Sequence, residues 1–109
     1  MNSLTAARLV LQLRHWQLAM NELLKREPGR FCVPIHCALG HEAVAAATRL
    51  AMKPADRLLL THRNMAFHLA HAGALEPLLL EYELSAAGLA GGRFGSMNLQ
   101  NPAAGLVYT

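Results

Sequence analysis

The chain has 109 residues, which is enough for one small domain with a single hydrophobic core. Charged residues make up only 16% of it and hydrophobic residues 53%, so we expect a partner to cover part of the apolar surface. Ten basic and seven acidic residues give a net charge of +3, but the basic residues are scattered, which argues against nucleic-acid binding.

Residues 3–27 are predicted to form one long amphipathic helix. Ser3 is the expected N-cap, and Pro28-Gly29 is expected to stop the helix. Apolar residues recur at steps of three and four, the period of a helix that buries one face, so this segment is interpreted as a packing helix. The apolar positions are Leu9, Leu13, Trp16, Met20 and Leu23.

Residues 30–38 are expected to be an irregular or extended connector. A second helix is predicted to begin near Gly40 and to continue through 42–52, because the alanine-rich run favours helix and Pro54 ends it in a turn. The short apolar run 57–61 is consistent with a buried strand, although periodicity alone cannot distinguish it from helix.

Two further helices are predicted before the glycine-rich segment that begins at residue 88. The first covers 64–72, with Asn64 as N-cap and Gly73 closing it. The second covers 75–87, with Pro77 in its first turn, where the missing N–H is tolerated.

Residues 88–109 are predicted to be a glycine-rich loop and tail with nothing regular in them. The apolar ending at 106–108 indicates a chain that is interrupted rather than finished. We therefore expect 1–109 to form a single incomplete domain, mostly helical, with one short strand.

The sequence favours a cytoplasmic location. No stretch reaches the roughly 18 uninterrupted apolar residues of a membrane span, and the N-terminus lacks the pattern of a signal peptide. Cys32 and Cys37 lie close together around Pro34, which is not a disulfide framework.

Two cysteines and two histidines in the segment 32–41 could in principle bind zinc tetrahedrally. Their spacing is not that of a zinc finger, and Pro34 and Gly40 prevent one continuous helical face, so buried cysteines and separately bonded histidines are the favoured interpretation. The four residues are Cys32, His36, Cys37 and His41.

Two segments could bind an anion. Residues 61–64, Thr-His-Arg-Asn, follow the predicted strand and open a predicted helix, where backbone N–H groups attract anions and an arginine can grip phosphate. The glycine-rich segment 91–97 is neither a dinucleotide-binding fingerprint nor a Walker loop, and alone it is typical of a flexible surface loop.

Five segments gain meaning from their order. Residues 35–43 read Ile-His-Cys-Ala-Leu-Gly-His-Glu-Ala, and 53–57 read Lys-Pro-Ala-Asp-Arg. Residues 61–63 read Thr-His-Arg, 69–73 read Leu-Ala-His-Ala-Gly, and 92–97 read Gly-Arg-Phe-Gly-Ser-Met. This series resembles the N-terminal part of the alpha subunit of thiamine-diphosphate-dependent 2-oxo acid dehydrogenases (pyruvate or branched-chain type) and acetoin dehydrogenases.

The resemblance implies an α/β parent fold, the thiamine-diphosphate-binding fold, of which this chain is an N-terminal fragment. It places His62 and Arg63 against the cofactor diphosphate and His36 near the reacting end, where an imidazole can donate to an oxyanion or move a proton. The loop at the mouth of the site would carry Gly95, Ser96 and Met97.

The sequence also departs from the family. His41 replaces the family's glutamine, while Met65 and Asn98 stand where the family has histidines, and His68 falls on a different helical face from Met65. The family's magnesium motif, which begins Gly-Asp-Gly, would lie beyond the C-terminus, and Asp56 is the only aspartate, so no metal site is expected within this chain.

The resemblance therefore implies a partial thiamine diphosphate site, with the magnesium ligands supplied by another chain or a missing segment. The implied chemistry is oxidative decarboxylation of a 2-oxo acid, or cleavage of acetoin, with acyl transfer to a lipoyl carrier. The implied partners are the remainder of the alpha subunit and a beta subunit in an oligomer, and the chain alone should be inactive. The alternative is a degenerate, non-catalytic helical interaction module. A neighbouring reading frame encoding Gly-Asp-Gly and the paired asparagines would favour the first interpretation.

Overall fold

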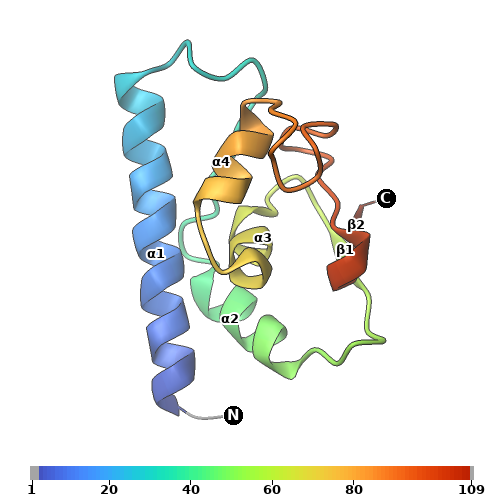
Figure 1. Ribbon diagram of the computed structural model, residues 1–109. Helices are drawn as coiled ribbons and strands as arrows, with labels where there is room; N and C mark the ends of the chain where they lie inside the picture. The colour runs from blue at the N-terminus through green and yellow to red at the C-terminus, as the bar shows by residue number, and fades with distance from the viewer. Residues whose placement is uncertain (1–2, 109) are drawn as a thin grey trace.

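The computed structural model describes residues 3–108 and gives a small, mostly helical domain with a short two-stranded parallel sheet (Figure 1). Residues 1–2 and 109 of the predicted domain lie outside the described part. The elements, in chain order, are α1 (Ser3–Arg26), α2 (Glu42–Ala51), β1 (Leu58–Leu60), α3 (Met65–Ala72), α4 (Glu76–Tyr82), the 3-10 helix η1 (Pro102–Ala104) and β2 (Leu106–Tyr108).

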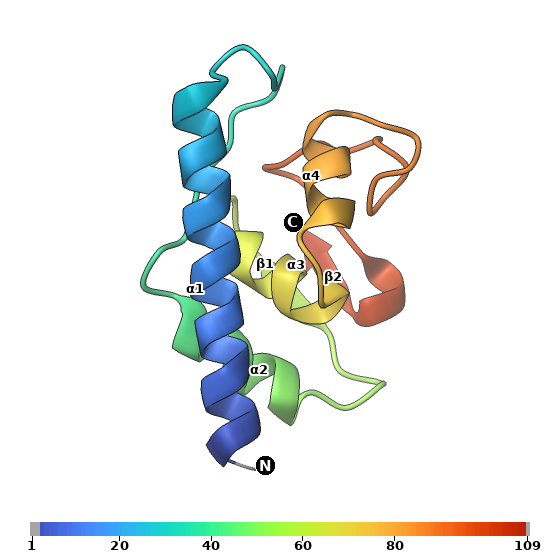
Figure 2. The ribbon, with the colours of Figure 1, turned by 60° about the vertical axis from the view of Figure 1, so that its left-hand side comes forward.

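Helix α1 forms one side of the molecule and packs against α2 and α3 (Figures 1 and 2). The sheet lies on the far side of α3 from α1 in Figure 1. The predicted long helix is confirmed, and it ends just before Pro28, as expected for a residue that cannot continue a helix. Ser3 is the first helical residue described rather than the residue before the helix. Leu13 and Met20 are fully buried in the core, together with Met65 and Leu69 of α3. None of the helices in residues 3–108 combines the length and the apolar character needed to cross a membrane.

The sheet corrects the prediction of one strand followed by nothing regular. Strand β2 pairs with β1 in parallel, with Leu59 opposite Val107. Gly105 allows this pairing, because its φ is 80° and a Cβ there would lie 2.3 Å from the carbonyl oxygen of Asp56. The Gly105 carbonyl then accepts a 2.7 Å hydrogen bond from the Leu58 N–H at the start of the ladder. A three-residue strand carries no periodic signal, so its partner could not be read from the sequence.

Helix α4 is shorter than predicted, because it ends at Tyr82 and not near residue 87. Leu84 adopts a left-handed conformation with φ of 60°. The Leu84 N–H donates to the Glu81 carbonyl and the Ser85 N–H donates to the Leu80 carbonyl, which is the Schellman pattern that closes a helix. A leucine in the position usually occupied by glycine hides this stop from sequence inspection.

Candidate functional site

Three segments that are far apart in the sequence meet on one side of the domain. They are the connector 34–37, the turn 61–64 between β1 and α3, and the loop residues 95–97. The Ser96 hydroxyl donates to the carbonyl oxygen of Pro34, so the loop is tied to the connector. The structure thus brings together the predicted residues His36, His62, Arg63, Gly95, Ser96 and Met97.

His36 and His62 meet directly. Their ring centroids are 5.3 Å apart and the ring planes are inclined at 85°, an edge-to-face arrangement. His62 is exposed and His36 is half-buried. Neither imidazole has a hydrogen-bond partner within residues 3–108, so their ring nitrogens are available to a ligand.

Arg63 is exposed and leans on the connector. Its Nη1 donates a 3.0 Å hydrogen bond to the carbonyl oxygen of Cys37, and its backbone N–H donates to the Thr61 hydroxyl at 3.2 Å. No acidic side chain pairs with Arg63 in the part of the chain that the structure describes. Its remaining guanidinium donors are therefore free to bind an anion. Burial raises the pKa of the Cys37 thiol, and the positive charge of Arg63 opposes that rise.

Asn64 occupies the residue before α3 as predicted, but its side chain does not cap the helix. It is buried instead, and its Nδ2 donates to the carbonyl oxygens of Ser96 and Met97 at 3.3 Å and 3.2 Å. The capping hydrogen bond was therefore a wrong prediction, although the helix begins and ends where expected, with Gly73 left-handed at its C-terminus. Asn64 links the loop to the Arg63 turn.

Gly95 does not offer its N–H to a ligand, because that N–H donates to the Glu81 carboxylate at 3.0 Å. A Cβ at Gly95, where φ is 74°, would lie 2.9 Å from a methyl carbon of Val33. Gly95 therefore serves close packing of the loop against the connector. Ser96 is buried and Met97 is half-buried beside it.

Glu42 anchors the connector to α1, which the sequence did not indicate. Its carboxylate accepts from Arg14 Nη2 at 2.9 Å and from Gln17 Nε2 at 2.6 Å, and it also accepts from the Gly40 N–H. Burial raises the pKa of the Glu42 carboxyl, but the hydrogen bonds from Arg14 and the backbone lower it more, so it stays below its usual range. Gln17 also holds both backbone polar groups of Ala38.

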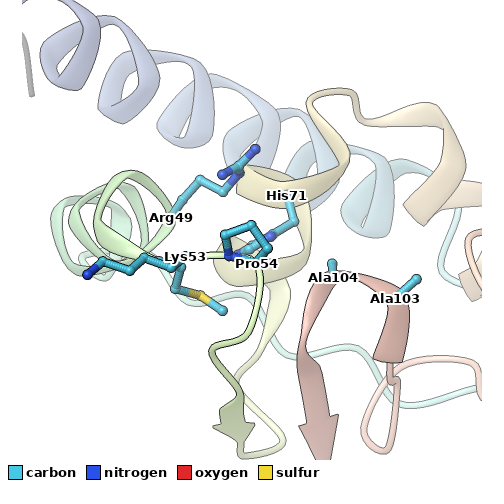
Figure 3. Close-up of a pocket in the computed structure, with 7 residues that line it drawn as sticks. Arg49, Lys53, Pro54, His71, Ala103 and Ala104 are labelled. Atoms are coloured by element: carbon cyan, nitrogen blue, oxygen red, sulfur yellow. The ribbon is translucent and has the colours of Figure 1, made fainter.

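A pocket of about 290 Å³ lies elsewhere, between the C-terminal ends of α2 and α3 and the η1 turn (Figure 3). It contains none of the predicted site residues. Burial lowers the pKa of His71 in this pocket, and the nearby Arg49 lowers it further. The pocket is lined by Arg49, Met52, Lys53, Pro54, His71, Ala103 and Ala104. This hollow is therefore separate from the candidate site.

Within residues 3–108 no group of three or more His, Cys, Asp or Glu side chains is arranged to hold a metal ion. Cys32 is exposed and Cys37 is half-buried, and both are free thiols. No protein-family model matches the chain, and no curated protein matches it.

Proposed function

We propose that this chain is the N-terminal portion of a thiamine-diphosphate-dependent dehydrogenase alpha subunit, with a parent fold of the thiamine-diphosphate-binding type. Its role is to supply part of the cofactor diphosphate site. One observation supports this above the others: three family-like segments converge, with His36 against His62, Arg63 against Cys37, and Ser96 against Pro34.

The exposed donors suit a diphosphate. Arg63 carries a permanent charge, and its planar fork matches two phosphate oxygens. His62 adds a second donor next to it, because its ring nitrogens have no partner in the described chain. His36, whose ring contacts that of His62, could donate a hydrogen bond or hold a proton at its ring nitrogen.

The residues that the structure describes, 3–108, do not fit magnesium, because they form no group of three or more side chains arranged to hold a metal ion. Mg²⁺ needs oxygen ligands in octahedral geometry, and the one aspartate, Asp56, accepts the Lys53 N–H at 2.7 Å in its turn. The proposal therefore assigns the metal ligands to another polypeptide or segment. Bound thiamine diphosphate supplies the carbanion chemistry for decarboxylation of a 2-oxo acid or cleavage of acetoin, with a lipoyl carrier as acyl acceptor. The assembly is proposed to be a cytoplasmic oligomer with a beta subunit.

The second candidate is a non-catalytic helical interaction module. Two observations favour it. Leu11 and Leu18 of α1 are 70% and 48% exposed, and they lie seven residues apart, on one helical face. Met65 also replaces a histidine of the family with a thioether that is fully buried in the core.

A nuclear magnetic resonance titration separates the two candidates. The chain, labelled with ¹⁵N, is titrated to about 5 mM with thiamine diphosphate and, as a matched ligand, with thiamine, at which concentration millimolar binding is visible. The proposal predicts chemical-shift changes at the rings of His36 and His62 and at the Arg63 side chain when thiamine diphosphate is added, and none when thiamine is added. No shift at these residues, or the same shift with thiamine, would favour the interaction module.

A further inference from the structure

The Glu81 carboxylate lies at the centre of the glycine-rich loop. It is completely buried, and four backbone N–H groups donate to it. Oε1 accepts from Ala90 at 2.7 Å and from Gly92 at 2.8 Å. Oε2 accepts from Phe94 at 3.0 Å and from Gly95 at 3.0 Å. The loop is therefore wrapped around one side chain.

Close packing explains why glycines stand in this loop. A Cβ at Gly88 would lie 2.6 Å from the Cα of Glu81, so the chain passes directly over the carboxylate-bearing residue. A Cβ at Gly92, where φ is 73°, would lie 2.5 Å from the carbonyl oxygen of Ser85. These are backbone clashes that no side-chain movement can relieve. Gly88 thus lets the chain pass close to Glu81, and Gly92 lets the loop pack against the end of α4.

Backbone N–H groups, not a cation, compensate the buried charge. Within residues 3–108 no Lys, Arg or His side chain forms an ion pair with Glu81. An ionised carboxylate removed from water needs hydrogen-bond donors, and each of its oxygens receives two. This is the geometry of an anion-binding loop whose anion belongs to the protein itself.

We propose that Glu81 is the positioning residue of the candidate site, the internal anion around which residues 88–97 fold. The geometry continues directly from it to the site. The Gly95 N–H donates a hydrogen bond to Glu81, and the hydroxyl of Ser96, the residue after Gly95, donates to the Pro34 carbonyl. The Asn64 side chain then donates to the carbonyls of Ser96 and Met97. Glu81 thus sets where Ser96 and Met97 stand relative to the Arg63 turn.

This role of Glu81 also determines which groups remain available to bind a ligand. Four of the loop's N–H groups, those of Ala90, Gly92, Phe94 and Gly95, donate to Glu81, so they cannot receive a cofactor phosphate, and that role falls to Arg63 and His62. Near the site, the loop can offer a ligand the half-buried side chain of Met97, because the Ser96 hydroxyl already donates to the Pro34 carbonyl. This last step rests on the proposed function, whereas the relation between Glu81 and the loop does not.

The test compares Glu81→Gln, which keeps the shape and removes the charge, with Glu83→Gln as the matched control. Glu83 pairs with Arg30, and among the described residues its side chain forms no hydrogen bond or ion pair with the loop. In Glu81→Gln, amide hydrogen exchange at residues 90, 92, 94 and 95 should accelerate by about 10-fold or more, because a neutral amide cannot accept four hydrogen bonds. The Asn64 side-chain NH₂ signal should shift as well, while amides of α1 keep their protection and Glu83→Gln changes neither.

Chemical rescue gives a second, independent readout. Glu81→Ala leaves space for a small carboxylate, so formate should restore loop protection, or folding if the variant is unfolded, where equal concentrations of chloride do not. Unchanged exchange and an unchanged Asn64 signal in Glu81→Gln, or the absence of formate rescue, would overturn the proposal.

A final experiment tests whether Glu81 positions the residues of the candidate site. With thiamine diphosphate, Glu81→Gln should lose the perturbation at Met97 and keep that at Arg63. If Glu81→Gln instead keeps the Met97 perturbation, Glu81 does not position this residue. If the wild-type chain shows no perturbation at either residue, the proposed function fails, and the exchange and rescue results still decide the role of Glu81.

Discussion

The imidazole rings of His36 and His62 meet edge-to-face, with their centroids 5.3 Å apart. This contact joins the irregular connector to the turn that follows β1. The neighbouring Arg63–Cys37 hydrogen bond, at 3.0 Å, fastens the same two segments a second time. Together they define a surface rich in hydrogen-bond donors, and the account of function depends on this surface.

The isolated chain should bind thiamine diphosphate weakly even with magnesium present. Residues 3–108 contain no cluster able to hold the metal, so the diphosphate would contact only Arg63 and His62. Isothermal titration calorimetry should show no affinity tighter than about 1 mM. Micromolar, magnesium-dependent binding would mean that the chain contains a metal site that the structure does not indicate.

We expect the isolated chain to self-associate. Leu11, Leu18 and Leu59 are 70%, 48% and 61% exposed, and large exposed apolar surfaces mark interfaces. Sedimentation velocity at micromolar concentration should show species larger than a monomer. Replacing both Leu11 and Leu18 with glutamate should reduce association, whereas a wild-type chain that sediments as a compact monomer would refute the expectation.

Stability should fall as the pH is lowered from 7.5 to 5, and His68 should be one cause. Burial lowers the pKa of His68 to about 4, although its hydrogen bond with the Leu99 carbonyl opposes this shift. The ordinary value is about 6.5, so in this window the unfolded chain binds the proton and the folded chain does not. The contribution of His68 to stability is fully present above its ordinary pKa and is lost as the pH falls toward the pKa of the folded state. At pH 5 this loss amounts to about 2 kcal/mol.

Urea unfolding at both pH values provides the measurement, with His68→Gln as the comparison. The variant should be less stable at pH 7.5 and should show a smaller loss on acidification. Glu42 and Glu81, whose pKa values are lowered, act in a separate window at lower pH. An equal pH dependence in the wild type and in His68→Gln would show that His68 is not responsible.

The connector should depend on Glu42 for its attachment to α1. Glu42→Gln removes a buried charge that Arg14, Gln17 and the Gly40 N–H all contact, and should cost about 2 kcal/mol of unfolding free energy. The matched control is Glu22→Gln, which removes an exposed ion pair with Arg26 and should cost less than about 0.5 kcal/mol. Equal effects of the two substitutions on the urea midpoint would contradict this role.

The helices were predictable because their signals are local. The apolar period of α1, the stop at Pro28 and the left-handed Gly73 can each be read within a few residues. The pairing of the sheet could not be predicted, because β2 is too short for a periodic signal. The end of α4 could not be predicted either, because Leu84 adopts a left-handed conformation that its residue type disfavours.

The candidate site, like the fold, could be predicted from the sequence only in part. The resemblance named residues that the fold brings together, although the end of α4, which lies between the Arg63 turn and the loop, was predicted wrongly. Glu42 and Glu81 were missed, because a glutamate in a helix is normally a surface residue and nothing local reveals that loop N–H groups will surround it. Asn64 was assigned a common local role, yet its side chain bonds to the distant loop.

The central claim is that Arg63 grips the cofactor diphosphate, and titration of thiamine diphosphate into a complex completed by a chain carrying the magnesium motif tests it most directly. Arg63→Ala should weaken the affinity by about 10-fold to 100-fold, the effect of losing a charge-assisted contact of about 1.5–3 kcal/mol. Arg63→Lys should recover only part of this loss, and His62→Ala should cost less, because a neutral imidazole contributes one uncharged hydrogen bond. The control is Arg57→Ala, which removes an exposed arginine whose hydrogen bonds within residues 3–108 go to the carbonyls of Ala55 and Asp56, and it should leave the affinity unchanged. An Arg63→Ala complex that binds as tightly as the wild type would contradict the account at its most specific position.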